Sequence, residues 1–319
     1  MAEKVIRTIG VLTSGGDAPG MNAAIRAVVR TALGKGLKVR GIRRGYSGLL
    51  NEEIIDLSAR DVSDTIQRGG TILLTARCEE MRTPEGQQKA AAICKKYGID
   101  GLVVIGGDGS FAGAQKLANL GVNTIALPGT IDLDIACTDY TIGFDTAVNT
   151  AMEAIDKVRD TSTSHERCSI IEVMGRDAGF IALNSGIATG ALDILIPERK
   201  DSMDDLFSTF RMAEKVGKSS SIVVVAEGEE LGSIYDLAKA TKEEFPNYDI
   251  RVTILGHIQR GGSPSCADRV LASNLGYGAV IGLMEGKNKV MVGMQSNKIT
   301  YTPIEEAIKK HNEIDKNLL

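Results

Sequence analysis

The chain has 319 residues, of which 43% are hydrophobic and 24% are charged, and its formal net charge is −4. Single hydrophobic cores stop growing at about 250–300 residues, so this length predicts two domains. The small negative charge argues against a general binder of nucleic acid or of anionic membranes. No apolar run approaches the ~18 residues that a membrane span needs, so no membrane partner is expected.

The cysteines form no CxxC pair and share no metal-ligand spacing with the three histidines. An odd, scattered set of this kind is typical of reduced thiols in a chain of this size. We therefore predict a cytoplasmic protein without a zinc site. The cysteines are Cys78, Cys94, Cys137, Cys168 and Cys266.

Short apolar segments, many rich in Val and Ile, alternate with amphipathic segments along the whole chain. They lack polar alternation, which is typical of strands buried on both faces. The predicted strands span residues 8–13, 38–42, 101–105, 124–127, 169–173, 194–196, 221–226 and 252–255.

Helices are predicted between these strands. Residues 21–33 place Ile25, Val28 and Leu33 on one face, and residues 111–120 form another helix. Gly36 and Gly98 follow helical segments, as glycines that end helices do. Alternating strands and helices predict an α/β fold with mostly parallel sheets covered by helices on both faces.

The first strand is followed by the sequence SGGDAPGMN at residues 14–22, which opens a helix. Ligands of open α/β sheets bind beyond the carboxyl ends of the strands. Glycines let backbone N–H groups approach phosphate oxygens, and a helix N-terminus adds partial positive charge. The same glycines also suit a plain turn, and the loop matches neither the GxGxxG nor the P-loop pattern.

The strand at 101–105 is followed by GGDGS at residues 106–110, which again opens a helix. A carboxylate beside bound phosphate is repulsive, at about 4 kcal/mol for two charges ~4 Å apart at an effective dielectric of ~20. Mg²⁺ removes that repulsion and accompanies nucleotide phosphates. Asp108 is therefore a candidate Mg²⁺ ligand, and a turn or helix cap is its alternative role.

The strand at 124–127 is followed by PGTIDLD at residues 128–134, the most acidic of the three loops. In an extended segment residues i and i+2 point the same way, so Asp132 and Asp134 can face one site. One carboxylate can hold Mg²⁺ while the other accepts a hydroxyl proton. A surface turn remains the alternative.

Arginines follow several strand ends or lie in glycine-bearing loops, which favours an anionic substrate. Guanidinium groups bind phosphate through two parallel hydrogen bonds. His257 lies in the sequence GHIQRGGS and suits either phosphate binding or a structural hydrogen bond. The arginines are Arg77, Arg82, Arg167, Arg176, Arg251 and Arg260.

Together these segments resemble the bacterial ATP-dependent phosphofructokinases. The resemblance extends from residue 9 to at least Arg269 and rests on seven segments: TSGGDAPGMNAAIR, RGGTILLTAR, VIGGDGS, PGTIDLD, TDYTIGFDTA, VMGRDAG and LGHIQRGGSP. It implies two Rossmann-like three-layer α/β/α domains. Residues 1–138 and 252–302 would form a large ATP-binding domain, and residues 139–251 and 303–319 a small sugar-phosphate-binding domain.

The resemblance implies transfer of phosphate from ATP to fructose 6-phosphate, giving fructose 1,6-bisphosphate and ADP in the committed step of glycolysis. Asp132 corresponds to the general base, Thr130 to a substrate contact beside it, and Arg176 to the cation that stabilises the transferring phosphoryl group. Asp108 and Asp134 correspond to the Mg²⁺ side of the site. The ATP-site positions are Gly16, Tyr46, Arg77, Cys78, Arg82, Gly107, Asp108, Gly109 and Ser110. The sugar-phosphate positions are Thr130, Asp132, Arg167, Met174, Gly175, Arg176, Glu227, Arg251, His257 and Arg260.

Further expectations follow from the same resemblance. Gly109 and Gly129 favour ATP, because pyrophosphate-using relatives carry Asp and Lys there. Arg167 and Arg251 correspond to residues lent across a subunit interface, which implies a homotetramer. Phosphoenolpyruvate or ADP would act at an effector pocket with Arg26, Arg30, Arg60, Arg159, Gly190 and Lys218.

The chain departs from the family pattern in two places. Leu133 replaces an Asn between the two acids, and Ala136 with Cys137 replaces a Lys-Gly pair. In the effector pocket two cations and one acid are lost, so we expect weakened allosteric control. The replacing residues are Ala59, Val216 and Leu192, with Asp193 one position from the lost acid.

Three other functions remain as alternatives. NAD kinases and diacylglycerol-type lipid kinases share Gly-Gly-Asp-Gly but lack the PGTID and GHIQRGG segments. A non-catalytic sugar-phosphate sensor is disfavoured by the intact Asp108, Asp132, Asp134 and Arg176. A nicotinamide dehydrogenase is disfavoured because no GxGxxG follows a strand.

Overall fold

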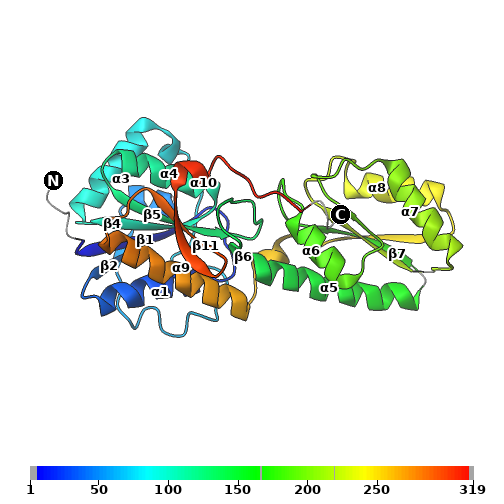
Figure 1. Ribbon diagram of the computed structural model, residues 1–319, viewed down its shortest axis with the longest axis horizontal. Coiled ribbons are helices and arrows are strands. Elements are labelled where there is room, and N and C mark those ends of the chain that lie inside the picture. Colours follow the sequence, from blue (N-terminus) through cyan, green and yellow to red (C-terminus); the bar gives the residue numbers. More distant parts are fainter. Residues whose placement is uncertain (1–5, 166, 219, 316–319) are drawn as a thin grey trace. The chain divides into compact units, whose positions relative to one another are not determined.

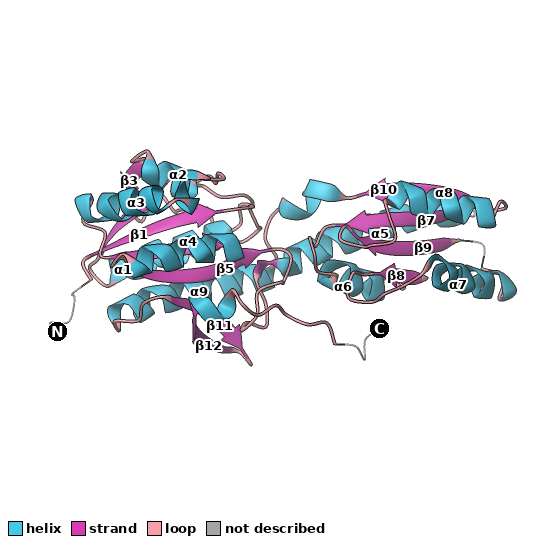
Figure 2. Ribbon diagram, turned by 90° about the horizontal axis from the view of Figure 1, so that it is seen from above, coloured by secondary structure: helices cyan, strands magenta, loops and turns pink. Residues whose placement is uncertain are grey.

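The computed structural model describes residues 6–165, 167–218 and 220–315. The chain divides into two compact units, Met1–Thr146 with Arg260–Asn312, and Ala147–Gln259 with Glu313–Leu319. It therefore passes between the units after residues 146, 259 and 312. Each unit is an α/β/α sandwich with a largely parallel sheet, so the predicted fold class is confirmed (Figures 1 and 2). The ligand expected for each domain remains a prediction.

The sheet of the first unit has the order β12-β11-β5-β4-β1-β2-β3 within the described residues, and β6 pairs with β5. The pairs β2–β3 and β11–β12 are antiparallel, and the other pairs are parallel. The strands are β1 (Thr8–Ser14), β2 (Lys38–Ile42), β3 (Ile54–Asp56), β4 (Gly101–Gly106), β5 (Asn123–Thr130), β6 (Ile142–Gly143), β11 (Val290–Gln295) and β12 (Lys298–Pro303).

Helices cover both faces of this sheet (Figure 1). One face carries α1 (Met21–Gly34) and α9 (Cys266–Met284). The other carries α2 (Gly45–Leu50), α3 (Pro84–Lys96), α4 (Asp108–Asn119) and α10 (Ile304–Ala307), with the short helix η1 (Glu80–Arg82) beside them. Under this second layer Leu102 and Val104 of β4 belong to one buried cluster with Phe111 and Leu117 of α4.

The second unit has a four-stranded, all-parallel sheet of order β10-β7-β9-β8 in the described residues. The strands are β7 (Arg167–Val173), β8 (Asp193–Leu195), β9 (Ser221–Ala226) and β10 (Asp249–Ile254). The helices are α5 (Phe144–Ser164), which begins in the first unit, α6 (Phe180–Thr189), α7 (Met203–Lys215), α8 (Ile234–Glu244) and the short η2 (Gly256–Arg260). Phe210, Phe245 and Tyr248 stack edge to face or tilted in the core of this unit.

The strands predicted from apolar runs are confirmed with small shifts at their ends. Gly36 and Gly98 adopt positive φ angles of 75° and 62° directly beyond α1 and α3. Beyond α1 the amide of Leu37 donates to Ala32 O at 2.9 Å, which is the hydrogen bond of a glycine-ended helix. Strands β3, β6, β11 and β12 were not predicted. β3 and β6 are short, and β12 lies partly exposed at the sheet edge. β11 lies inside the sheet between β12 and β5 and was simply missed.

Asp268 joins three elements of the first unit. It is 1% exposed, and its carboxylate accepts the N–H groups of Gly143 and Thr146, each at 2.8 Å. Burial raises the pKa of this carboxyl group. The start of α9 therefore anchors β6 and the first turn of α5.

No helix among the described residues is long and apolar enough to cross a bilayer.

Candidate active site

The three loops singled out from the sequence lie at one edge of the first unit's sheet. Strand β4 pairs in parallel with both β1 and β5, and Gly106 lies opposite Ser14 on one side and Pro128 on the other. The hydroxyl of Ser110 donates to Ser14 O at 3.0 Å. A Cβ atom on Gly106 would lie 2.3 Å from Ser14 O, so only glycine permits this approach. The structure thus brings the three predicted loops together.

The first glycine loop is also tied to the segment before the predicted ATP-site arginines. Thr75 donates its hydroxyl to Gly15 O at 2.7 Å, and Thr13 donates to Leu74 O at 2.9 Å. Asn22, which is 1% exposed, donates to Arg68 O and Gly69 O and accepts the amide of Ile72. The buried Thr13 and Asn22, together with the half-buried Thr75, therefore fix the course of residues 68–75 along the loop.

The predicted ATP-site residues that follow this segment lie near its end. Arg77 and Arg82 are exposed, and Arg82 pairs with Glu79 at 3.3 Å. Cys78 is half-buried against the core cluster of the first unit. An exposed pair of this kind contributes little to stability, so both arginines remain available to an anionic ligand.

Arg260 lies against the first glycine loop. Its Nη1 atom lies 3.3 Å from Asp17 O, and a Cβ atom on Gly16 would lie 2.6 Å from the same nitrogen. The resemblance assigned Gly16 to ATP and Arg260 to the sugar phosphate. Gly16 and Arg260 both belong to the first unit, where they are in contact.

The second glycine loop opens α4 with Gly107 as its N-cap and no side-chain cap. Asp108 is the first helical residue, and its Oδ1 accepts the amide of Gly109 at 2.7 Å. The carboxylate thus accepts an amide of the first helical turn, as the turn or cap alternative expects, and its role as a Mg²⁺ ligand stays a prediction. Nothing lies within 4 Å of a Cβ atom built on Gly107 or on Gly109, so both positions face open space within their unit.

Tyr46 contacts the second glycine loop at the start of α4. The ring is 4% exposed, and its hydroxyl donates to Ser110 O at 2.7 Å. It also packs on α4, because a Cβ atom on Gly113 would lie 2.7 Å from the ring. Burial, followed by the neighbouring Cys94 and Cys78, raises the pKa of Tyr46 well above its usual value. The contacts of Tyr46 thus hold the helix start of the predicted ATP site in place.

The third loop holds the proposed base in a defined geometry. Thr130 Oγ1 donates to Asp132 Oδ2 at 3.2 Å, and the amide of Asp132 returns a hydrogen bond to Thr130 Oγ1 at 3.2 Å. Both side chains are buried, at 8% and 6% exposure. Thr141 donates to Thr130 O at 2.7 Å and fixes the start of the loop. Thr130 and Asp132 are thus hydrogen-bonded to each other, while the substrate contact expected for Thr130 stays a prediction.

The two departures in this loop both carry left-handed backbone. Leu133 has φ of 56° and Cys137 has φ of 69°. Glycine and asparagine adopt this region far more readily than leucine or cysteine. The backbone geometry thus explains why asparagine and glycine suit these two positions. Nothing in the structure explains Ala136.

In the second unit, the loop beyond β7 is organised by Glu227. Its Oε1 accepts the amide of Arg176 at 2.6 Å and that of Gly175 at 3.3 Å. The amide of Met174 donates to Gln259 Oε1 at 3.2 Å. Burial, with Glu227 as the second cause, raises the pKa of Glu172. These predicted sugar-phosphate residues therefore meet at the carboxyl ends of neighbouring parallel strands, with the exposed His257 on η2.

Arg167 and Arg251 lie together at the other end of that sheet. Asp249 Oδ2 accepts from Arg167 Nε at 2.7 Å and from Arg251 Nη2 at 3.0 Å. Arg167, followed by Arg251, lowers the pKa of the Asp249 carboxyl group. Arg167 begins β7 whereas Met174 follows its end, a distance of roughly 20 Å at ~3.3 Å per residue. Arg167 is therefore distant from the Met174–Arg176 loop of its own unit.

Among the predicted effector residues, Arg159 and Gly190 meet in the second unit. The guanidinium of Arg159 donates to the carbonyls of Thr189 and Gly190. Asp193, one position from the lost acid, is paired with Arg199 at 3.1 Å. Lys218 follows α7, and the remaining predicted effector residues belong to the first unit: Arg26, Arg30 and Arg60.

Sequence reasoning missed several residues that shape these loops, because their contacts join distant segments. Gln259 lies inside the recognised segment LGHIQRGGSP and is fully buried, and Asn312 lies outside every recognised segment.

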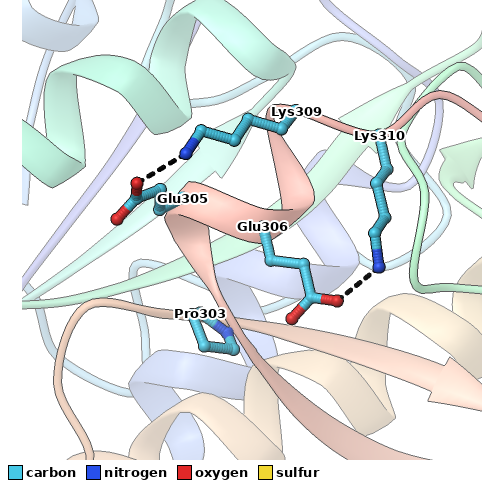
Figure 3. Close-up of a pocket in the computed structure, with 5 residues that line it drawn as sticks. All are labelled: Pro303, Glu305, Glu306, Lys309 and Lys310. Carbon is cyan, nitrogen blue, oxygen red and sulfur yellow. Dashed lines mark hydrogen bonds and ion pairs between the residues drawn. The ribbon is translucent and has the colours of Figure 1, made fainter.

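A separate hollow of about 390 Å³ lies beside α10 (Figure 3). The acidic and basic side chains of this hollow pair with one another. None of the residues that line it belongs to the three loops after β1, β4 and β5. The lining residues are Pro303, Glu305, Glu306, Lys309 and Lys310.

Comparison with known proteins shows the family of this chain and agrees with its fold. The family model described as phosphofructokinase matches residues 8–283. An ATP-dependent 6-phosphofructokinase of Clostridium botulinum is 59% identical over 313 residues, which cover 98% of this chain and 97% of that protein. A protein of the same name from a Thermoanaerobacter species is 57% identical over 314 residues. The chain belongs to the phosphofructokinase family.

Solved structures extend the comparison. A phosphofructokinase from Saccharomyces cerevisiae matches with a TM-score of 0.89 and 37% identity, over 95% of this chain and 45% of that one. This chain thus spans less than half of the yeast chain. A pyrophosphate-dependent phosphofructokinase from Marinobacter aquaeolei has a TM-score of 0.87 at 23% identity, over 98% of this chain and 86% of that one, which shows the shared fold.

Proposed function

We propose that this protein transfers the γ-phosphoryl group of ATP to the 1-hydroxyl of fructose 6-phosphate, giving fructose 1,6-bisphosphate and ADP in glycolysis. The observation that carries the proposal is the meeting of three strand-end loops, two rich in glycine and one holding a buried base, at one sheet edge. Relatives at 59% and 57% identity bear the name of this activity.

Asp132 is the proposed general base. The hydrogen bond from Thr130 Oγ1 occupies Oδ2 from one side and orients the carboxylate. An ionised carboxylate accepts the proton of the sugar hydroxyl as that oxygen attacks phosphorus. Phosphoryl transfer otherwise depends on positioning and on neutralising charge. The glycine loops supply backbone N–H groups for the phosphates, and Arg176 is the proposed partner of the transferring group.

Asp108 and Asp134 would hold Mg²⁺. Carboxylate oxygens are the ligands that Mg²⁺ prefers, and this ion is commonly held by one or two carboxylates together with substrate phosphates. These two residues follow the neighbouring strands β4 and β5, which supports the assignment. When bound, the ion would neutralise the phosphate charge beside Asp108 and Asp134.

Fructose 6-phosphate is the proposed ligand of the loops at the carboxyl ends of β7, β9 and β10. Glu227 holds the backbone of Gly175 and Arg176, and Gln259 holds that of Met174. His257 and Arg260 would add contacts to the 6-phosphate. A non-catalytic sugar-phosphate sensor would bind fructose 6-phosphate without turnover. A lipid kinase, an NAD kinase or a dehydrogenase would act on a different substrate.

Arg167 and Arg251 support a homotetramer. Both lie at the end of their sheet opposite the Met174–Arg176 loop, so neither is placed to serve that loop within its own unit. We propose that they contact the sugar phosphate of a neighbouring copy, as the resemblance implies. A cytoplasmic location is part of the same proposal.

Effector control is proposed to be weak. Val216 leaves an exposed apolar side chain where a lysine was expected, and Asp193 is engaged by Arg199. Each lost charge-assisted hydrogen bond is worth about 1.5–3 kcal/mol, enough to lower effector affinity several-fold or more. Fructose 6-phosphate saturation should then be close to hyperbolic and change little with ADP or phosphoenolpyruvate. Strong sigmoidicity that ADP abolishes would refute this.

A coupled assay tests the main proposal. ATP and pyrophosphate are compared as donors, and fructose 6-phosphate, NAD and a diacylglycerol as acceptors. Turnover with ATP and fructose 6-phosphate, and much less with every other pair, is the expected result. Binding of fructose 6-phosphate without turnover would instead favour the sensor.

A further inference from the structure

A side chain near the end of the chain holds the backbone of the loop that carries Asp132 and Asp134. Asn312 Nδ2 lies 2.9 Å from Leu133 O and 3.0 Å from Ile135 O. An amide nitrogen carries two hydrogens, so one asparagine can donate to both carbonyls. Ile135 also forms an antiparallel bridge with His311, so the end of the first unit is paired with this loop.

The middle of the loop has a backbone conformation that needs such support. Leu133 has φ of 56° and its side chain is 7% exposed. Left-handed backbone at a leucine is unfavourable and persists where the surroundings determine it. Relaxation of Leu133 to an ordinary φ would turn the peptide planes on both of its sides. Those planes connect Leu133 to Asp132 and to Asp134.

Other contacts also hold this loop, and His311, next to Asn312, bridges Ile135 and places Nδ1 3.4 Å from Asp134 O. Thr141 fixes its start through Thr130 O at 2.7 Å. Thr138 fixes its end, because its hydroxyl accepts the amide of Met294 at 3.1 Å. Between these ends, both carbonyls that flank Asp134 on the chain accept from Asn312. Asn312 thus donates to the central turn on both sides of Asp134 from more than 170 positions away in the sequence.

We propose that Asn312 is a positioning residue for phosphoryl transfer, which keeps Leu133 in its left-handed conformation and thereby sets the directions of Asp132 and Asp134. This inference rests on the function proposed for that loop. Asn312 touches neither carboxylate through these bonds and acts through the backbone alone.

The first test compares Asn312→Ala with Lys310→Ala in the full-length chain. Lys310 lies two positions away and pairs on the surface with Glu306 at 2.6 Å, so it is a matched control (Figure 3). Asn312→Ala should lower kcat about tenfold, as expected for two lost hydrogen bonds, and leave both KM values within about twofold. Lys310→Ala should match the unchanged chain. Equal kcat for the two variants would overturn the proposal.

A rescue separates positioning from a general loss of stability. Leu133→Asn introduces a residue that accepts left-handed backbone, so the loop should need Asn312 less. Adding Asn312→Ala to Leu133→Asn should then cost much less kcat than it costs alone. Equal costs in both backgrounds would overturn the coupling. Asn312→Asp keeps the volume but offers no donor when ionised, and serves if the alanine variant fails to fold.

Hydrogen exchange gives a readout that does not depend on activity. Peptides covering residues 131–137 should exchange faster in Asn312→Ala than in the unchanged chain or in Lys310→Ala, while peptides from β7 and β9 should not change. Unchanged exchange in 131–137 would contradict the structural role of Asn312. If the unchanged chain showed no turnover with fructose 6-phosphate, the proposed function would fail, whereas the exchange result would still test this residue.

Discussion

The guanidinium of Arg260 occupies the space that a side chain on Gly16 would need, since a Cβ atom there would lie 2.6 Å from Arg260 Nη1. Gly16 does not have a left-handed φ, so its backbone would accept alanine. The contact with Arg260 is therefore what requires glycine. This relationship couples the first glycine loop to an arginine expected to bind a different ligand.

Gly16→Ala should displace Arg260 and weaken the binding of fructose 6-phosphate as well as that of ATP. Losing one charge-assisted contact to phosphate costs about 1.5–3 kcal/mol, so KM for fructose 6-phosphate should rise about tenfold or more. Initial rates at varied concentrations of each substrate measure the effect. Gly34→Ala is the matched control, because nothing lies within 4 Å of the added methyl group. A change confined to ATP would show that Arg260 does not reach the sugar phosphate.

Asp132→Asn should remove the base and leave the fold intact. The amide fills the same volume beside Thr130 but cannot take up the hydroxyl proton, so kcat should fall by a factor of at least about 10². KM values and the melting temperature should change little. Asp64→Asn, in an exposed turn, is the control. Near-normal turnover of Asp132→Asn would remove Asp132 from this role.

Much of this fold followed from local patterns. The loops after β1, β4 and β5 could be predicted because each carries its own signal. The first two show an apolar run, then glycines, then a helix, and the third shows an apolar run followed by two acids. Parallel strands bring such loops to one edge. The contact between Gly16 and Arg260 had no such signal, since 243 positions separate Arg260 from Asp17. Asn312 was missed for the same reason. The left-handed φ of Leu133 is set by contacts and not by the preference of leucine, so its sequence position indicated only a departure.

Gly109→Asp should reduce the use of ATP without disturbing the fold. Open space surrounds a Cβ atom at this position, so the side chain fits sterically. A second carboxylate beside Asp108 would repel the phosphates, by up to ~4 kcal/mol at 4 Å and an effective dielectric of ~20, so KM for ATP should rise at least tenfold, by order of magnitude. Gly109→Ala adds bulk without charge and separates the two causes. An unchanged KM for ATP in Gly109→Asp would place this residue away from the bound nucleotide.

Mixing two inactive variants tests whether Arg251 serves a neighbouring copy. Asp132→Ala lacks the base and Arg251→Ala lacks the arginine, so each alone should be nearly inactive. If Arg251 acts across an interface, a hybrid pair contains one site with both groups intact. After subunit exchange at equal amounts, about a quarter of the sites should be complete. Native mass spectrometry would establish that hybrids have formed, and Asp132→Ala mixed with Asp132→Asn should stay inactive. Hybrids without activity would mean that Arg251 acts in its own chain or only through Asp249, to which it donates at 3.0 Å.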